Sequence, residues 1–173
     1  MPPLVRTASP SDAQAMGEVH VRAWRAAYRG ILSDALLDGL TASKSAEGWA
    51  RAIAGAGDER VVLVAEDEGR VVGFAGGGPA VPEGEDGRFE LYVLNVDPAR
   101  WSRGLGGALL DRFVAWTSGR GERGLMLRVA RDNARARRFY ERRGWAWDGT
   151  EASRELLGDR VVECRYRRSG VIG

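Results

Sequence analysis

The stretch VDPARWSRGLGGALL, residues 96–110, joins the end of an apolar strand to a glycine-rich turn and the start of an amphipathic helix. Amides in the first turn of a helix have no partner within the helix, and the helix dipole favours an anion there. Gly104, Gly106 and Gly107 lack the side chains that would keep a phosphate away from those amides. The stretch therefore predicts a phosphate-binding turn between a strand and a helix.

Two other phosphate-binding motifs do not match this turn. A P-loop needs glycine followed by lysine and serine or threonine, and the single lysine of the chain is the distant Lys44. A dinucleotide-binding turn needs a third glycine where Leu109 stands. It also needs an acidic residue about 20 positions further on, where residues 125–127 are LML. On these residues alone, a glycine-rich turn without a ligand stays open.

Hydrophobic spacing on both sides of the turn predicts a mixture of helices and strands. The expected helices cover residues 12–28, 33–40, 46–53, 105–116 and 134–143. The expected strands cover residues 4–7, 61–65, 71–75, 89–96, 125–129, 145–150 and 160–167, with residues 76–79 and 82–87 as loops. This order predicts one α+β domain over residues 1–173, built on a mixed, mostly antiparallel sheet flanked by helices.

Composition is that of an ordinary globular protein, with 44% apolar and 29% charged residues in a chain of 173. No apolar run approaches the roughly 20 residues that span a bilayer, and the first residues lack the features of a signal peptide. The single cysteine, Cys164, excludes an internal disulfide and is expected to fill space in the core. We therefore expect a cytoplasmic protein without a membrane segment.

Arginine supplies almost all of the positive charge, but the net charge is only +2. Nucleic-acid binding usually needs a concentrated basic face. The arginines of residues 135–143 are the nearest candidate for such a face. We expect no nucleic-acid partner, and a nucleic-acid-binding domain that uses this segment remains an alternative.

A second motif, VARDNARARRFYERRGW at residues 129–145, places Asn133 at a strand-to-helix junction, ahead of Phe139 and Tyr140. Gly144 then ends the helix. The two motifs together resemble those of the GNAT superfamily of N-acetyltransferases. That family has an arginine/glutamine-x-x-Gly-x-Gly/Ala turn after a strand, then an asparagine, a Phe-Tyr pair and a glycine followed by an aromatic residue. The resemblance extends over about residues 61–167.

One position departs from the family pattern. Trp101 stands where glutamine or arginine is usual. Backbone amides can still hold a pyrophosphate without that side chain, and Arg100 or Arg103 could compensate. Trp101 itself is expected to pack either on the cofactor or on the protein surface.

The resemblance implies a GNAT-like twisted sheet and direct transfer of the acetyl group of acetyl-CoA to a primary amine, without a metal. It places acetyl-CoA along a strand that splays from its neighbour at residues 94–96, with pyrophosphate at residues 102–107. The implied cofactor-binding residues are Leu94, Asn95, Val96, Ser102, Arg103, Gly104, Leu105, Gly106, Gly107, Asn133 and Tyr140. An ordinary paired strand and a simple helix N-cap at Asn133 are the alternatives for two of these positions.

Acetyl transfer requires a deprotonated amine, a polarised thioester carbonyl and a proton for the departing thiolate. The resemblance implies that Tyr140 donates this proton, that the Val96 amide polarises the carbonyl, and that Glu90 acts as a base, often through water. A core aromatic and a strand-surface carboxylate are the respective alternatives. Trp24 and Tyr28 lie one helical turn apart and either wall the acceptor channel or pack in the core. The only histidine, His20, lies on the apolar face of the first helix and is expected to be structural.

These residues do not identify the acceptor, which we expect to be a small-molecule amine or a peptide N-terminus. Glu83, Glu85 and Asp86 could attract a cation, or they form a solvated turn. A homodimer also stays open, because relatives are often dimers. The main alternative function is a module that senses acyl-CoA without catalysis.

Overall fold

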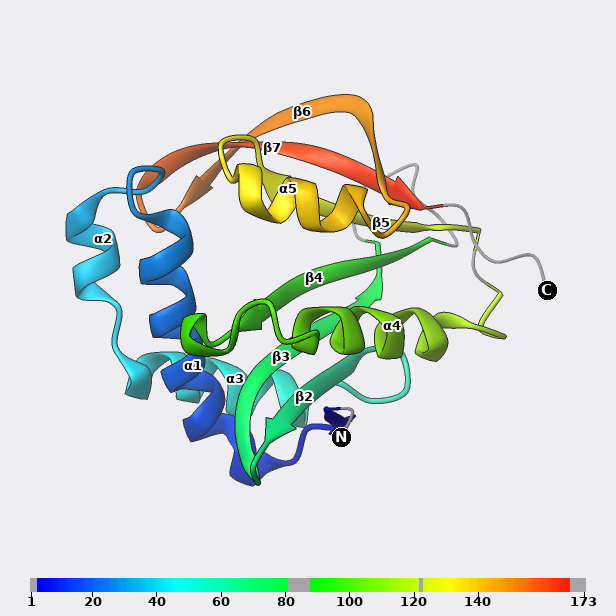
Figure 1. Cartoon of the computed structure of the whole chain (residues 1–173), viewed down its shortest axis with the longest axis horizontal. Helices are drawn as coiled ribbons and strands as arrows, with labels where there is room; N and C mark the ends of the chain where they lie inside the picture. The colour runs from blue at the N-terminus through cyan, green and yellow to red at the C-terminus, as the bar shows by residue number, and fades with distance from the viewer. Residues whose placement is uncertain (1–2, 81–87, 122, 169–173) are drawn as a thin grey trace.

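The computed structural model describes residues 3–80, 88–121 and 123–168, so the expected loop at 82–87, with Glu83, Glu85 and Asp86, lies outside the described residues. Within them, seven strands form one twisted sheet in the order β1-β2-β3-β4-β5-β7-β6 (Figure 1). The strands are β1 (Leu4–Thr7), β2 (Val61–Asp67), β3 (Arg70–Pro79), β4 (Phe89–Val96), β5 (Leu125–Ala130), β6 (Ala146–Leu156) and β7 (Asp159–Arg168). Every neighbouring pair is antiparallel except β4 with β5. The predicted fold class is confirmed.

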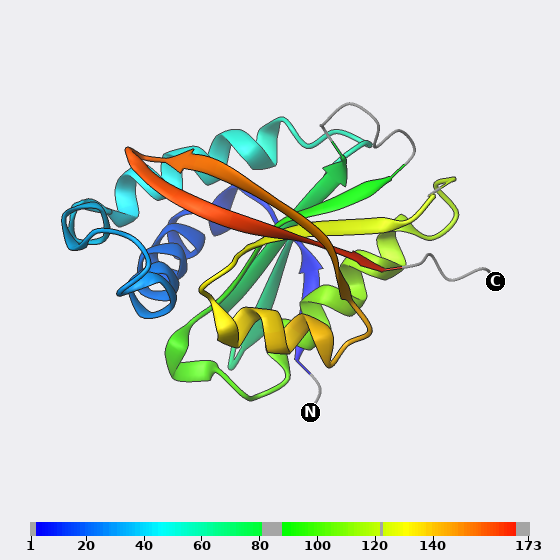
Figure 2. The same ribbon diagram turned by 90° about the horizontal axis from the view of Figure 1, so that it is seen from above.

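Helices cover both faces of the sheet (Figure 2). They are α1 (Ala13–Tyr28), α2 (Asp34–Gly39), α3 (Ala42–Ala54), α4 (Leu105–Thr117) and α5 (Ala134–Glu141), with short 3-10 turns at Pro10–Asp12 and Pro98–Arg100. Alternation along β2 explains the two layers, because Val62 and Val64 pack towards α1 and α3, whereas Val61 and Leu63 pack towards α4. Among the described residues, every helix is too short or too polar to cross a lipid bilayer.

Helix boundaries follow local capping. The Ser33 hydroxyl accepts a hydrogen bond from the Leu36 amide at 3.2 Å, which starts α2 where the sequence predicts it. Helix α5 ends at Glu141, two residues before its predicted end. Gly144 still terminates it, because this glycine adopts a φ of 80° and the next amide, of Trp145, donates to the Tyr140 carbonyl at 3.1 Å.

The predicted loop at residues 76–79 is wrong, because these residues continue β3 as far as Pro79. Their glycines serve close packing rather than a turn. A Cβ atom on Gly77 would lie 2.4 Å from Cε2 of Phe113 in α4 and 2.5 Å from the carbonyl oxygen of Glu90. The pairing with β4 also shifts here, since Gly76 pairs with Val93 and Gly77 with Leu91, which leaves Tyr92 as an extra, bulged residue.

The C-terminal hairpin is longer than predicted. Strand β6 runs to Leu156, beyond the expected end at residue 150, and the turn lies at Leu157 and Gly158. Side chains of β6 are exposed along almost its whole length, so no apolar alternation marks its second half. In β7, Cys164 is fully buried, which confirms its prediction as a core residue.

Strands β4 and β5 separate after a short region of contact. Their parallel pairing covers only Phe89 to Leu91 against Leu125 to Leu127. Beyond it, β4 stays paired with β3 and β5 with β7 (Figure 1). Within the part of the chain that the structure describes, the edge of β4 that faces β5 therefore has no strand partner from Tyr92 to Val96.

Candidate active site

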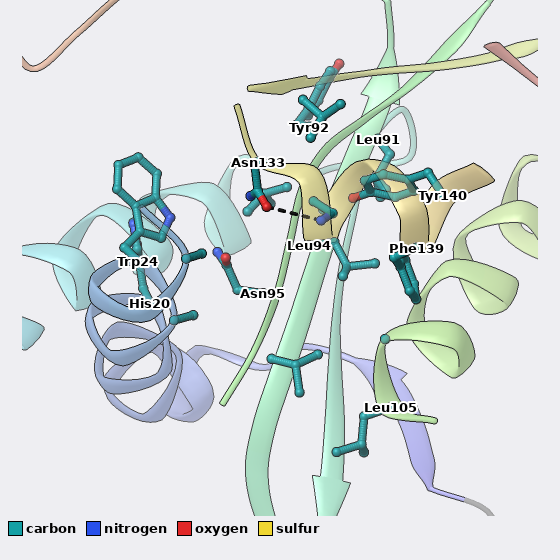
Figure 3. A pocket seen from close by; sticks show the side chains of 18 of the residues that line it. His20, Trp24, Leu91, Tyr92, Leu94, Asn95, Leu105, Asn133, Phe139 and Tyr140 are labelled. Carbon is teal, nitrogen blue, oxygen red and sulfur yellow. Dashed lines mark hydrogen bonds between the residues drawn. The ribbon is translucent and has the colours of Figure 1, made fainter. Parts of the chain in front are cut away.

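A cavity of about 1220 Å³ occupies the region where β4 and β5 separate (Figure 3). Ligand pockets usually have volumes of about 300–1,000 Å³, so this space is large enough for an extended ligand. Its walls come from α1, the free edge of β4, the turn before α4, and α5. The cavity passes between the separated strands β4 and β5, from the face of the sheet that carries α4 and α5 to the face that carries α1.

The turn before α4 has the geometry of an anion site. Gly104 is the N-cap of α4 with a φ of 81°, and Ser102 also has a positive φ, of 64°. The guanidinium of Arg143 lies directly over the helix N-terminus, because a Cβ atom on Gly107 would be 2.0 Å from its Nη2 atom. Five of the six predicted pyrophosphate-binding residues line the cavity, namely Ser102, Gly104, Leu105, Gly106 and Gly107. Arg103 is the exception, since its guanidinium lies 3.9 Å from Asp67.

Trp101 joins this turn to β4. Its indole nitrogen donates to the carbonyl oxygen of Val96 at 2.9 Å, and the guanidinium of Arg135 lies over its ring at 3.4 Å. Burial lowers the pKa of Arg135. Arg100 forms ion pairs with Asp67 and Glu68 at 3.2 and 3.5 Å. Trp101, which stands where glutamine or arginine is usual in the family, therefore holds the turn against the end of β4.

Positive charge is concentrated on this side of the cavity. The arginines that line it are Arg100, Arg135, Arg142 and Arg143. No carboxylate of the described residues lines this side with them. Arg100 is already paired with Asp67 and Glu68, so the guanidinium groups that suit a ligand with several phosphate oxygens are those of Arg135, Arg142 and Arg143. The arginine cluster of residues 135–143 thus borders the cavity in part, instead of forming a separate flat surface.

The free edge of β4 and the start of α5 face each other across the cavity. Leu94, Asn95 and Val96 line it on one side, and Asn133 lines it on the other. Asn133 caps α5, because its side-chain oxygen accepts a hydrogen bond from the Ala136 amide at 3.1 Å (Figure 3). Unpaired backbone groups along β4 could bind an extended amide-containing chain in the manner of an added strand.

Tyr140 lies at the inner end of this channel. Its side chain is buried and lines the cavity, and Figure 3 shows its hydroxyl directed towards the side of Leu94 and Asn133. The hydroxyl has no hydrogen-bond partner among the described residues. Burial raises the pKa of this phenol, with a further contribution from Tyr28. The phenol therefore keeps its proton at neutral pH and can donate it.

Glu90 occupies a different position. Its buried carboxylate forms a salt bridge with Nη1 of Arg128. Arg128 lines the cavity, but Glu90 does not. The bulge at Tyr92 accounts for this placement, because it reverses the alternation of β4 and puts Glu90 on the face opposite Leu94 and Val96.

Aromatic side chains on successive turns of α1 form the other wall. The ring of Trp24 lies 4.9 Å from those of both His20 and Tyr28, and all three line the cavity. His20 accepts a hydrogen bond from the Trp49 indole at 3.2 Å, and burial lowers its pKa to about 4. Its other ring nitrogen is buried without a partner among the described residues, as is the side-chain nitrogen of Asn95.

Sequence reasoning missed three charged residues on the side of the cavity that α1 walls. Arg128, Arg154 and Glu163 line it from β5, β6 and β7. Alternation along β7 indicates that Glu163 faces away from Cys164, but nothing in the sequence indicates that this face borders a cavity.

Comparison with known proteins gives one consistent result. Residues 21–145 match the model of the Acetyltransferase (GNAT) family. A Mycobacterium tuberculosis protein named as a probable N-acetyltransferase is 28% identical over 94% of this chain and 91% of its own length. A mycothiol acetyltransferase of Kineococcus radiotolerans is 49% identical, but the match covers 39% of this chain and only 22% of that protein. The crystal structure of PaiA N-acetyltransferase from Thermoplasma acidophilum, in complex with coenzyme A, superposes with a TM-score of 0.79 at 20% identity, covering 98% of this chain and 99% of that one.

Proposed function

Because this chain belongs to the GNAT family of acetyltransferases, we propose that it moves the acetyl group of acetyl-CoA to a primary amine of a small molecule or a peptide. The observation that carries the proposal is the continuity of the cavity. One space leads from the arginine-lined turn before α4, along the free edge of β4, to the buried phenol of Tyr140. The acceptor then has its own approach, along α1 on the opposite side of the split sheet.

The lining of the cavity fits the parts of CoA. The free amides of α4 and the guanidinium of Arg143 suit the diphosphate, as the glycine pattern of the turn predicts. The edge of β4 at residues 94–96, where Trp101 binds only the Val96 carbonyl, and the side chain of Asn133 suit the two amide groups of the pantetheine arm. Arg103 would need to leave Asp67 to join this site, so we assign it a minor part.

The chain itself has two direct tasks in the reaction. Bound acetyl-CoA supplies an activated acetyl group. Amides of the free β4 edge, that of Val96 in particular, are oriented to stabilise negative charge on the carbonyl oxygen. Tyr140 holds a proton for the sulfur that departs, and the proton that the amine nitrogen loses when its bond to the acetyl carbon forms returns to the phenolate, directly or through water. We propose that Glu90 acts indirectly, by fixing Arg128 at the cavity wall, since its own carboxylate lies behind that guanidinium.

A CoA titration and the Tyr140→Phe variant test the proposal. CoA should bind near one equivalent per chain and raise the melting temperature, because it binds only the folded state. Tyr140→Phe should lower the rate of thiol release by about 10²–10⁴-fold with little change in CoA affinity. Stability should hardly change, because the hydroxyl has no partner to lose.

Tyr166→Phe is the matched control, because this tyrosine is buried but does not line the cavity. Its hydroxyl accepts from Arg137 at 2.8 Å and donates to Glu141 at 2.7 Å. Its loss should cost about 1–2 kcal/mol of stability and leave the rate unchanged. A parent chain that gives neither heat nor a thermal shift with CoA would defeat the proposal. CoA binding without turnover of any amine would favour the acyl-CoA sensor instead.

A further inference from the structure

Glu163 is the single carboxylate among the described residues that line the cavity. It lies on β7 opposite Ala130 of β5, on the side of the split sheet where α1 forms the wall. Only 13% of its side chain is exposed. The other charged side chains that the structure describes along the cavity are arginines, so among these residues Glu163 alone offers an opposite charge to a positively charged ligand group.

The carboxylate of Glu163 lacks the hydrogen bonds that such groups normally have. Its nearest ion-pair partner, Nη1 of Arg154, lies 3.6 Å away on a side chain that is 58% exposed, and no described residue donates a hydrogen bond to it. By contrast, the buried carboxylate of Asp12 accepts bonds from Arg6 at 2.8 and 2.9 Å and from the Ser9 amide at 2.7 Å. A carboxylate that faces the cavity without protein donors is left to water, and a ligand ammonium would supply charge-assisted hydrogen bonds to it.

Glu163 also lies close to Trp24 and Tyr28, because both rings pack against a cluster that contains Ala130, its strand partner on β5, and Val161 of β7. After burial, its negative charge is the largest cause of the raised pKa of Tyr28. Tyr28 in turn contributes to the raised pKa of Tyr140. Tyr28 is therefore within electrostatic reach of both groups. Together with the ring of Trp24, 4.9 Å away, it gives the carboxylate an aromatic surface that favours a cation.

We propose that Glu163 binds the ammonium group of the acceptor, with Trp24 and Tyr28 forming the wall beside it. This inference rests on the proposed function, because it assigns the second substrate of the same reaction. It selects acceptors that arrive as cations, and such an ammonium gives one proton to Glu163 or to water before its nitrogen attacks the thioester. It also makes Arg154 a competitor for the carboxylate, so that ligand binding displaces this arginine.

Binding of two probes of nearly equal shape tests the proposal without any need to know the natural acceptor. The probes are phenethylammonium chloride and 2-phenylethanol, which lacks the positive charge. Each is titrated into the CoA-saturated protein by calorimetry. The parent should bind the ammonium at least about tenfold more tightly than the alcohol, as expected for a charge-assisted contact worth about 1.4 kcal/mol or more.

Three variants separate the proposed contact from indirect effects. Glu163→Gln should abolish the preference for the ammonium while CoA still binds as in the parent. Glu66→Gln removes a partly buried carboxylate that pairs with Arg6 away from the cavity, so it should keep the preference. Arg154→Met should strengthen ammonium binding, because it frees the carboxylate. Equal binding of both probes by the parent, or a preference that survives in Glu163→Gln, overturns the assignment. Failure of the parent to bind CoA would overturn the proposed function itself.

Discussion

Replacement of Gly77 by alanine tests the closest contact between the sheet and α4. The new Cβ atom would lie 2.4 Å from Cε2 of Phe113 and 2.5 Å from the carbonyl oxygen of Glu90. Phe113 is fully buried and stacks on Trp116, so its ring has little freedom to move away. The carbonyl belongs to the β3–β4 pairing and cannot rotate without breaking it.

Overpacking a close-packed core costs typically 1–3 kcal/mol, and a clash with backbone puts Gly77→Ala near the upper end, at about 3 kcal/mol. The smaller entropy of the unfolded alanine chain offsets at most about 1 kcal/mol. The net loss of about 2–3 kcal/mol should lower the melting temperature by roughly 5–10 °C in a chain of this size. CoA affinity should fall as well, because a shifted Phe113 moves the helix whose N-terminus forms the anion site.

Urea unfolding followed by circular dichroism measures the effect, with Gly48→Ala as the control. Gly48 lies inside α3, and a Cβ atom added there would meet no atom within 4 Å, so alanine at this position should stabilise the protein by up to about 1 kcal/mol. A Gly77→Ala protein whose free energy of unfolding lies within about 0.5 kcal/mol of the parent value would refute the described packing of α4 on β3.

Two further predictions concern the cavity walls. Trp101→Phe keeps a ring against Arg135 but removes the 2.9 Å hydrogen bond to Val96. We expect the free energy of unfolding, measured in urea, to fall by about 1 kcal/mol, and CoA binding, measured by calorimetry, to weaken. Unchanged CoA affinity would show that the turn does not depend on this hydrogen bond. His20 has a pKa of about 4 when folded and about 6.5 when unfolded, so below pH 6.5 the unfolded chain takes up a proton that the folded chain refuses. Its contribution to stability, about 3 kcal/mol in full, is present above pH 6.5 and is lost as the pH falls to 4. Unfolding curves at pH 7, 5.5 and 4 should therefore show that the free energy of unfolding declines less with falling pH in His20→Gln than in the parent. Parallel declines would contradict a buried neutral imidazole.

The anion turn was predictable because it depends on local backbone geometry. A positive φ at Gly104 and a backbone bare of side chains at Gly106 and Gly107 are properties that glycine itself encodes. The glycines at residues 76–78 misled the prediction for the same reason. Glycine marks turns and close contacts alike, and only the distant Phe113 decides between the two.

The sequence alone does not predict which face of β4 carries Glu90, nor what the face of β7 that carries Glu163 borders. Simple alternation puts Glu90 on the same face as Leu94 and Val96, but the bulge at Tyr92 reverses this relation, and no residue type announces the bulge. For Glu163, alternation gives the correct face. What that face borders depends on the separation of β4 from β5, which is a property of the assembled sheet.

The short contact between β4 and β5 also has a mechanical consequence. Strands β1 to β4 form one plate and strands β5, β7 and β6 another, and the seam that joins the two plates contains only three residue pairs. A ligand with a chain of amides along the free edge of β4 would lengthen this seam and restrict the motion of one plate relative to the other. Part of the binding free energy would then be spent on rigidity, and hydrogen exchange should slow on both plates when the gap is filled, well beyond the residues that touch the ligand.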